Sequence, residues 1–318
     1  MTDAYGRKIE YLRMSVTEGC NLHCSYCMPS EAGAKCPCSA QLSDAELVEI
    51  ARTAASLGMK KLRITGGEPL VRRGITELVR ELGKIDGIED LSLTTNATLL
   101  APVAREHYDA GIRRINISLD TLDPEKYKRI TGGGRLSDAL DGIKAAFDAG
   151  MSPVKLNAVL MGGVNDDEIA ALCELTKKYP VEMRFIELMP IGSAAGFEAA
   201  AFLPCSAVPE RLPELVPLPH EPHSVARLYR FPGAPGKVGL ISPLSDHFCA
   251  ECSRLRLTAD GFLKPCLHSA DEISVRGLHG EALRKAILLA VQRKPKQHVE
   301  LSATESSQSK RSMYRIGG

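Results

Sequence analysis

Hydrophobic residues recur with two different periods through the first two-thirds of the chain. Runs in which apolar and polar positions alternate predict β-strands at residues 11–17, 60–66, 90–96, 113–120, 153–160 and 181–189. Between these strands, the pattern predicts helices at 43–57, 74–84, 99–110, 136–149 and 166–178, the first with Ser43 as N-cap and Gly58 as stop. Strands and helices that alternate at this spacing indicate a parallel sheet with right-handed crossovers. A doubly wound sheet and a barrel both fit, but six units fall short of a closed eight-unit barrel.

The polar positions of the first five predicted strands share one face of the sheet, and this face is rich in cations. They are Arg13, Ser15, Thr17, Lys61, Arg63, Thr65, Ser92, Thr94, Asn96, Arg114, Asn116, Ser118, Asp120, Lys155 and Asn157. A parallel sheet that helices cover on both faces carries nearly continuous apolar strands, which is not the pattern here. The sequence therefore predicts that one face lines a wet cavity, as in a curled, incomplete barrel. A bare sheet face is the alternative, although parallel sheets are rarely left uncovered.

The character of the chain changes after residue 203. Residues 204–223 hold six prolines, which predict an irregular connector that cannot carry a central strand or helix. A smaller segment, 224–318, follows with a predicted helix at 280–293 and a polar tail from about 302 that is expected to be mobile. The predicted organisation is thus a partial barrel at 1–203, a connector at 204–223 and a C-terminal segment at 224–318.

Composition narrows the class of protein. The 318 residues are 44% hydrophobic and 25% charged, which is typical of a globular protein with a sizeable core. Forty basic and 39 acidic side chains leave a net charge of +1, so we expect no binding to nucleic acid or membranes through bulk charge. The start of the chain has no apolar signal-like stretch, and no apolar run reaches the length of a membrane span. A cytoplasmic protein is expected.

Eight of the ten cysteines fall into two groups. Cys20, Cys24, Cys27, Cys36 and Cys38 lie near the N-terminus, and Cys249, Cys252 and Cys266 lie near the C-terminus. A reducing cytoplasm argues against disulfides, and clustered thiols favour metal binding. Cys173 and Cys205 stand alone, and Cys173, within a helical pattern, is expected to be a small core residue.

The first group contains a Cys-x3-Cys-x2-Cys run, Cys20 to Cys27, directly after the first predicted strand. In α/β barrels, the catalytic residues lie at the carboxyl ends of the strands. Three thiolates can hold three irons of a [4Fe-4S] cube and leave the fourth iron open to another ligand. A zinc site that His23 or Cys36 completes is the alternative.

This run, with Tyr26 before its third cysteine, resembles the signature of the radical S-adenosylmethionine superfamily. The Ile-Thr-Gly-Gly-Glu-Pro run at 64–69 resembles the GGEP motif of that superfamily, which contacts the methionyl amine of the cofactor. The resemblance implies that Cys20, Cys24 and Cys27 hold a [4Fe-4S] cluster whose open iron binds S-adenosylmethionine. One electron then cleaves this cofactor to methionine and a 5′-deoxyadenosyl radical.

The second group, Cys249, Cys252 and Cys266, has a spacing that fits a zinc site with His247 or His268 and an iron–sulfur site equally well. The sequence at 239–266 resembles the GTP 3′,8-cyclases of molybdenum cofactor biosynthesis, in which a second three-cysteine [4Fe-4S] cluster binds the guanine of GTP. This resemblance extends over nearly the whole chain and includes the runs at 116–120, 164–167 and 184–190 and the terminal Gly-Gly.

The resemblance assigns roles to individual residues. It implies that Cys249, Cys252 and Cys266 hold the second cluster, and that Tyr26, Gly67, Glu68, Ser118 and Met189 contact S-adenosylmethionine. The residues implied to bind GTP are Arg13, Arg63, Thr94, Lys155, Arg184, Arg254 and Arg256, and those implied in catalysis are Arg254, Arg256, Gly317 and Gly318. Strand alternation independently places several of these cations on the cavity face, where they can neutralise a triphosphate. The alternatives are that the strand cations are solvated surface charges, that Arg254 and Arg256 lie on an exposed β-edge, and that the terminal glycines belong to a frayed tail.

The implied activity is that of a lyase that cyclises GTP to (8S)-3′,8-cyclo-7,8-dihydroguanosine 5′-triphosphate, with 5′-deoxyadenosine and methionine as by-products. The implied fold is an incomplete (β/α)6-type TIM barrel with a second iron–sulfur site in the C-terminal segment. The implied partners are GTP, an electron donor of unknown identity, the downstream cyclic pyranopterin monophosphate synthase and a second copy of the chain in a homodimer. Two alternatives are a radical S-adenosylmethionine enzyme that has an auxiliary cluster and acts on another substrate, and a zinc-stabilised binding module.

The chain departs from the family pattern at two places. Residues 34–39, which include Cys36 and Cys38, replace a loop that is usually longer and richer in acidic and apolar residues. Ala97 replaces the usual glycine after Thr94-Thr95-Asn96 and should be strained if that turn needs a positive φ.

Overall fold

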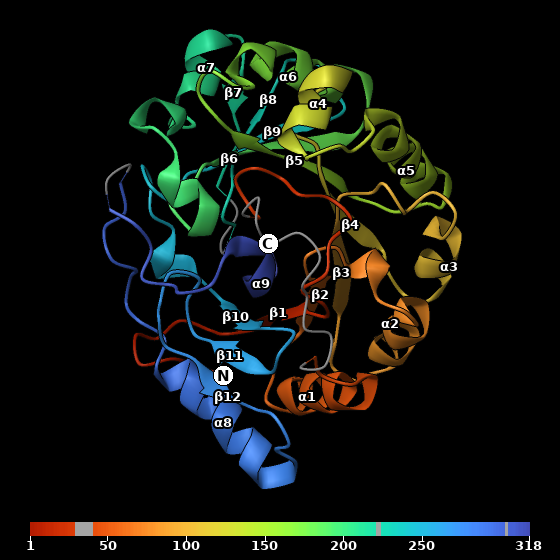
Figure 1. Ribbon diagram of the computed structural model, residues 1–318, viewed down its shortest axis with the longest axis vertical. Coiled ribbons are helices and arrows are strands. Elements are labelled where there is room, and N and C mark those ends of the chain that lie inside the picture. Colours follow the sequence, from red (N-terminus) through yellow and green to blue (C-terminus); the bar gives the residue numbers. More distant parts are fainter. Residues whose placement is uncertain (29–40, 221–223, 303–304) are drawn as a thin grey trace.

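The computed structural model describes residues 1–28, 41–220, 224–302 and 305–318. Their strands form a twelve-stranded sheet in the order β12-β11-β10-β1-β2-β3-β4-β5-β6-β9-β8-β7. The six strands that alternation predicts are present as β1 (Tyr11–Ser15), β2 (Lys61–Thr65), β3 (Asp90–Thr95), β4 (Arg114–Ser118), β5 (Val154–Leu160) and β6 (Val181–Glu187). Each pairs in parallel with the next. The sheet curls into an open barrel with helices around its outside (Figure 1).

The predicted helices are present as α1 (Asp44–Ser56), α2 (Ile75–Gly83), α3 (Ala104–Asp109), α5 (Leu136–Asp148), α6 (Ile169–Lys178) and α8 (Gly280–Gln292). Ser43 caps α1 as predicted, in a capping box with Glu46. The hydrophobic pattern did not predict α4 (Pro124–Ile130). Asp123 caps that helix by accepting the N–H of Lys126 at 2.7 Å, and Pro124 occupies its first turn, where no N–H is needed. Short 3₁₀ helices are η3 (Pro69–Val71), η4 (Asp166–Glu168), η5 (Gly192–Gly196), η6 (Ala199–Ala201) and η7 (Cys249–Glu251).

The apolar face of the strands forms the core beneath the outer helices. Leu12, Met14, Leu62, Ile64 and Ile117 are each at most 2% exposed. The opposite, polar face looks into the barrel, so the predicted division of the two faces is confirmed. Cys173 is fully buried in α6, as expected for a small core residue.

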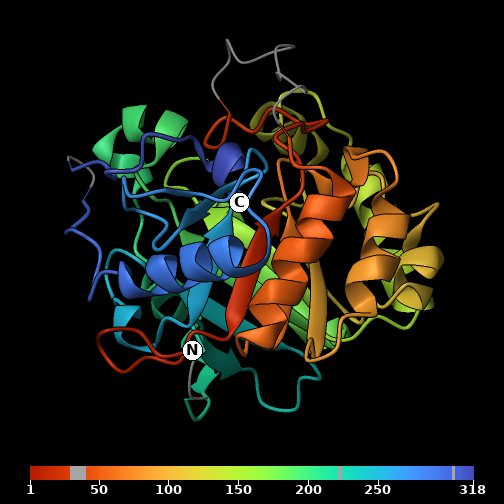
Figure 2. The same ribbon diagram turned by 90° about the horizontal axis from the view of Figure 1, so that it is seen from below.

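The C-terminal half adds strands to both edges of the barrel. These are β7 (Val216–Pro217), β8 (Arg227–Arg230), β9 (Lys237–Ile241), β10 (Arg254–Leu257), β11 (Phe262–Lys264) and β12 (Ile273–Ser274). β9 pairs in parallel with β6, and β10 pairs in parallel with β1. The 224–318 segment therefore belongs to the same sheet as the barrel, with α8 beside α1 on the outside (Figure 2).

In the described part of the proline-rich connector, 204–220, one short helix is present, α7 (Ala207–Arg211), where the sequence predicted only irregular chain. Pro209 is tolerated there because it stands in the first turn, where its missing N–H breaks no helical bond. Pro217 lies in the edge strand β7, a position that also needs no donor.

The chain ends inside the ring of strands. A four-residue helix, α9 (Met313–Ile316), lies there, and Ile316 is 1% exposed (Figure 1). The polar composition of this segment predicts mobility and does not indicate these contacts.

Ala97 has a φ of 63°, so the strain expected from the loss of the usual glycine is present. Cys36 and Cys38 lie outside the described residues. Within the described ranges, no helix combines the length and the apolar character that crossing a membrane requires.

Candidate active site

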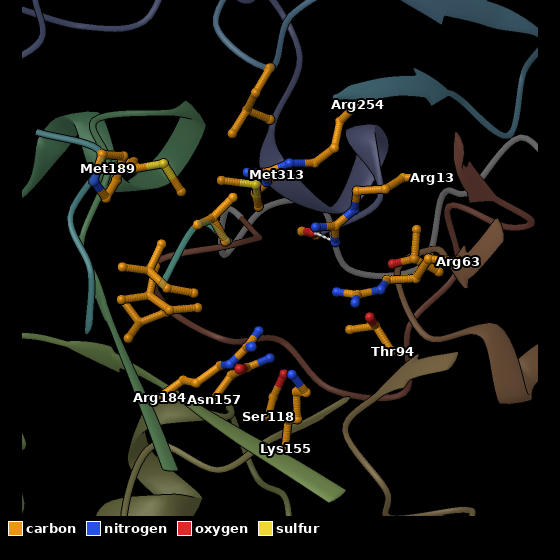
Figure 3. A pocket seen from close by; sticks show the side chains of 18 of the residues that line it. Arg13, Arg63, Thr94, Ser118, Lys155, Asn157, Arg184, Met189, Arg254 and Met313 are labelled. Carbon is orange, nitrogen blue, oxygen red and sulfur yellow. Dashed lines mark hydrogen bonds between the residues drawn. The ribbon is translucent and has the colours of Figure 1, made fainter. Parts of the chain in front are cut away.

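A cavity of about 760 Å³ occupies the interior of the barrel, as the polar strand face predicted. All seven residues expected to bind GTP line it: Arg13, Arg63, Thr94, Lys155, Arg184, Arg254 and Arg256. They come from β1, β2, β3, β5, β6 and β10, and in Figure 3 the labelled ones project toward a common space. The alternatives of solvated surface charges and an exposed β-edge are thus wrong for these positions.

Several polar atoms around the cavity are buried without a partner. Arg13 Nε, Thr94 Oγ1, Arg254 Nη2 and Arg256 Nη1 have no hydrogen-bond partner among the described residues. Buried donors are nearly always satisfied in folded proteins, by protein or by bound molecules. Orphaned guanidinium donors at one cavity fit a polyanionic ligand.

Burial and mutual repulsion weaken the charged state of these cations. Desolvation lowers the pKa of Arg63, and desolvation with repulsion from Arg184 lowers the pKa of Lys155 to about 8. Desolvation followed by the charge of Arg254 lowers the pKa of Arg256 to about 10. The free protein therefore holds crowded positive charge that an anionic ligand would relieve.

One carboxylate, Glu182, lies among these cations and was not identified from the sequence. It pairs with Lys155 at 3.1 Å and with Arg184 at 2.5 Å. These ion pairs orient both cations before any ligand binds. An isolated glutamate at a strand start carries no sequence signal for this role. Lys61 and Arg114 also line the cavity, and strand alternation had placed them on its face without assigning them a role.

The first cysteine group lies at the same cavity. Cys20, Cys24 and Cys27 line it from the loop after β1, where the N–H of Cys27 donates to the carbonyl of Cys24 at 2.9 Å. Burial raises the pKa of Cys20 to about 11 and that of Cys27 to about 12. Three thiols that share one desolvated pocket repel each other as thiolates, so a cationic iron cluster would fit this donor set.

The glycines of the 64–69 run are required by a close approach to the cysteine loop. A Cβ on Gly67 would lie 2.4 Å from the carbonyl oxygen of Gly19, and one on Gly66 would lie 2.7 Å from that of Thr17. The N–H of Gly67 donates to Thr17 O at 2.8 Å. Only glycine allows this contact, so the run supports the loop that carries the cysteines.

Four of the five residues expected to contact S-adenosylmethionine line the cavity, namely Tyr26, Gly67, Ser118 and Met189. Glu68 does not, since it is 1% exposed and its carboxylate accepts hydrogen bonds from Leu70 N, Thr95 Oγ1 and Asn96 N at 2.7–3.0 Å. Burial raises the pKa of Glu68 to about 7. The Glu68 carboxylate therefore links the turn after β2 to the turn after β3.

Asp120, two residues after β4, supports Tyr26, although the sequence pattern assigned it no role. Tyr26 donates its hydroxyl hydrogen to Asp120 Oδ2 at 2.8 Å, and the other carboxylate oxygen accepts the N–H of Val159 at 2.8 Å. Burial raises the pKa of Asp120 to about 6. Its place on the predicted polar strand face was the available signal.

The second cysteine group lies at the β10 side. Cys249 and Cys266 line the cavity, whereas Cys252 does not. Burial alone would raise the pKa of Cys252, but the charges of Arg254 and Lys294 lower it to about 6. Lys294 is 3% exposed and donates to the carbonyls of Arg254 and Pro265, both at 2.9 Å. A cationic setting of this kind favours a thiolate ligand.

The C-terminus reaches the cavity as well. Gly318 lines it, and the carbonyl oxygens of Gly317 and Gly318 accept hydrogen bonds from Arg13, at 3.2 Å for Gly317. Thr65 Oγ1 donates to Gly317 O at 3.1 Å. Gly317 has a φ of 81°, and a Cβ there would lie 2.7 Å from Thr65 Cγ2, so this position requires glycine.

Comparisons with known proteins agree with this arrangement. The family model described as "Radical SAM superfamily" matches residues 14–176, and that described as "Molybdenum Cofactor Synthesis C" matches 181–300. Two solved structures share the fold. Streptococcus suis SuiB has a TM-score of 0.63 at 17% identity over 91% of this chain and 66% of its own. The structure titled "Native anSMEcpe with bound AdoMet" has a TM-score of 0.63 at 14% identity, over 96% and 93%.

The fold and the first cysteine group thus define a member of the radical S-adenosylmethionine superfamily. Curated relatives named GTP 3′,8-cyclase match over the full length. The one from Alkaliphilus oremlandii is 46% identical over 100% of both chains, and the one from Peptoclostridium acidaminophilum is 48% identical over 100% of this chain and 98% of its own. The chain belongs to the GTP 3′,8-cyclase family.

Proposed function

We propose that this chain cyclises GTP to (8S)-3′,8-cyclo-7,8-dihydroguanosine 5′-triphosphate inside the barrel, with 5′-deoxyadenosine and methionine as by-products. The observation that carries the proposal is the set of buried, unpartnered donors on Arg13, Thr94, Arg254 and Arg256 at a cavity that both cysteine groups reach. Family membership supports the reaction, and the cavity supports a triphosphate substrate.

Cys20, Cys24 and Cys27 would hold one [4Fe-4S] cluster. When bound, this cluster and S-adenosylmethionine supply the 5′-deoxyadenosyl radical that abstracts the 3′-hydrogen of GTP. Tyr26, Gly67, Ser118 and Met189 would line the cofactor pocket. Glu68 would act indirectly, because its carboxylate is already bonded to the turns after β2 and β3.

Cys249, Cys252 and Cys266 would hold a second [4Fe-4S] cluster that receives the guanine. The positive charges of Arg254 and Lys294 beside Cys252 support a thiolate ligand there. The triphosphate would lie against Arg13, Arg63, Lys155 and Arg184, whose guanidinium and ammonium groups form charge-assisted hydrogen bonds with phosphate.

Catalysis by the chain would consist mainly of positioning. GTP fixed at both ends presents its 3′-hydrogen to the cofactor side and its C8 to C3′, so that ring closure needs little further motion. Arg254, Arg256, Gly317 and Gly318 would border the reacting part of the substrate, and the enclosing barrel would exclude water.

The cellular setting follows from the family. The product would enter molybdenum cofactor biosynthesis through a downstream cyclic pyranopterin monophosphate synthase, and an electron donor would reduce the clusters. We expect this to take place in the cytoplasm, without nucleic acid or membrane partners, and with a homodimer as the expected assembly.

The test is anaerobic incubation of the reconstituted protein with GTP, S-adenosylmethionine and a reductant. We expect 5′-deoxyadenosine and the cyclised nucleotide in equal amounts, and neither when GTP is left out. GTP-independent cleavage with no GTP binding would indicate another substrate. A colourless protein with about two zinc ions would indicate a binding module.

A further inference from the structure

One arginine in the C-terminal segment is enclosed by carboxylates. The Arg311 side chain is 10% exposed, and its guanidinium donates to both carboxylate oxygens of Asp260 at 2.8 and 2.9 Å. It also donates to both oxygens of Glu272 at 2.7 and 2.8 Å. Its flat face lies over the ring of Phe262, 5.1 Å from the centroid. Nε and Nη2 form a forked ion pair with Glu272, and Nη1 bonds to both oxygens of Asp260. These ion pairs and the contact with Phe262 fix the orientation of the side chain.

The partners of Arg311 belong to the strands beside the second cysteine group. Asp260 lies between β10 and β11, Phe262 begins β11, and Glu272 directly precedes β12. Glu272 also accepts a hydrogen bond at 3.1 Å from Lys264, whose side chain is fully buried. Arg311 therefore joins the C-terminal tail to a rigid part of the sheet.

A second set of contacts joins the same tail to the first cysteine group. Arg315 Nε donates to Glu18 Oε1 at 3.0 Å, and Arg311 lies 3.9 Å from the same carboxylate. Glu18 is 7% exposed and stands two residues before Cys20. Three cations (Arg311, Arg315 and Lys264) thus face three carboxylates (Asp260, Glu272 and Glu18) along the tail.

The end of the tail is short and depends on contacts with other elements. α9 has four residues, and a helix that short is unstable by itself. Arg13 and Thr65 donate hydrogen bonds to Gly317 O, and a Cβ added at Gly317 would lie 2.7 Å from Thr65 Cγ2, so the turn is closely fitted to β1 and β2. Contacts upstream of this turn add to these bonds by fixing where the tail enters the cavity.

We propose that Arg311 is a positioning residue, whose paired bonds to Asp260 and Glu272 dock the tail so that Gly317 and Gly318 meet Arg13 in the cavity. The docking itself is independent of the reaction, and only its effect on turnover rests on the proposed function. Lysine cannot replace this arginine fully, because a single ammonium nitrogen cannot form the forked pair with Glu272 and bond to Asp260 on the other side at the same time.

The experiment compares the full-length reconstituted protein with Arg311→Ala and Arg311→Lys by hydrogen exchange of the C-terminal peptide under anaerobic conditions. The Gly318 N–H donates to Met313 O at 3.2 Å, so its exchange reports the docked turn. We expect exchange in 313–318 to accelerate at least tenfold in Arg311→Ala and less in Arg311→Lys. In the same samples, kcat for GTP cyclisation should fall at least tenfold in Arg311→Ala while KM for GTP changes less than threefold.

Arg293→Ala is the matched control, because it removes an exposed ion pair with Asp271 in the same segment, and this pair shares no hydrogen bond or ion pair with the described residues of the tail. Arg293→Ala should leave hydrogen exchange in 313–318 and kcat for GTP cyclisation unchanged. Unaltered tail exchange in Arg311→Ala, or fast exchange with unaltered kcat, would overturn the proposal. Should Arg311→Ala not fold, Asp260→Asn and Glu272→Gln are the substitute variants, since each removes one ion pair of Arg311. Unchanged hydrogen exchange of 313–318 in both variants would also overturn the proposal. A loosened tail in a protein that never cyclises GTP would contradict the proposed function and leave the docking role intact.

Discussion

At the scale of single residues, burial in the cavity changes the pKa of the cations that line it. Lys155 lies between Glu182, which pairs with it, and Arg184 and Arg114, which repel its charge. Desolvation and this repulsion together outweigh the attraction of Glu182 and lower the pKa of Lys155 to about 8. The ammonium is thus charged at neutral pH but releases its proton more readily than a surface lysine.

This pKa predicts a pH dependence of GTP binding. Below pH 8 the ammonium attracts phosphate, and above pH 8 the neutral amine does not, so affinity should fall by up to about tenfold per pH unit beyond that point. GTP titrations at pH 7, 8 and 9 measure the effect. Lys155→Arg, which stays charged throughout, should abolish the decline, and an unchanged decline in that variant would assign it to another group.

At the scale of elements, two loops are built against each other with almost no free space. The turn after β2 reaches the loop after β1 so closely that Gly66 and Gly67 contact backbone carbonyls of 17–19. Since this loop leads directly into Cys20, the position of the first cysteine group depends on a neighbouring strand turn rather than on its own sequence alone.

Gly67→Ala should therefore impair the first cysteine group selectively. The new Cβ would lie 2.4 Å from Gly19 O, and because that atom is backbone, the loop must move. We expect reconstituted iron to fall from about eight to about four per chain, with the second group retained. Iron and sulfide analysis with electron paramagnetic resonance measures this.

The matched control is Gly196→Ala, since a Cβ at Gly196 meets no atom within 4 Å. It should keep the full iron content. A full complement of iron in Gly67→Ala would show that the loop tolerates the shift and that the close approach is not required.

At the scale of the whole molecule, the charge of the cavity is assembled from distant parts of the chain. Arg13 and Arg256 come from the paired strands β1 and β10, and Lys155 and Arg184 come from the paired strands β5 and β6. The curl of the sheet brings these two pairs of strands around one cavity. Each cation is ordinary in its own strand. Together they form a desolvated positive site that destabilises the free protein and that a polyanion would neutralise.

We therefore expect GTP to stabilise the folded chain, in a salt-dependent way. At one hundred times its Kd, GTP should raise the free energy of unfolding by about 2.7 kcal/mol. Raising NaCl from 50 to 500 mM at constant GTP should reduce this gain, because salt weakens binding of a multiply charged ligand. Thermal unfolding with and without GTP measures both effects. Guanosine, which lacks the phosphates, should stabilise far less, and an equal shift with guanosine would place the binding energy in the base instead of the cations.

Much of the fold was predictable, because local alternation and helical periodicity determine which segments form strands and helices. The six strands β1 to β6, and the two faces of the first five, followed from such patterns. Helix α4 was missed because it is short and buries only Tyr127 and Ile130, too few positions for a clear period. The parallel pairing of β10 with β1 was also missed, because nothing in either segment specifies a partner more than 200 residues away.

The site was predictable to a similar extent. Strand alternation placed Arg13, Arg63 and Lys155 on the cavity face. The family resemblance added Arg184, Arg254 and Arg256, and together with the cysteine spacing it identified both thiol groups. Glu182 and Arg311 were missed, because a charged residue acquires such a role only through neighbours from other elements. The carboxylate of Glu68 is bonded to two turns of the barrel, and its contact with the cofactor stays a prediction.

The sequence by itself determined the strand–helix units, the polar inner face and the two sets of thiols, because these are local properties of spacing and periodicity. Only the tertiary structure decided that both sets reach one cavity, that β9 and β10 extend the barrel on either side, and that the last two glycines meet Arg13. The physical reason is that each of these depends on contacts between residues far apart in the chain, whose energy no local pattern encodes.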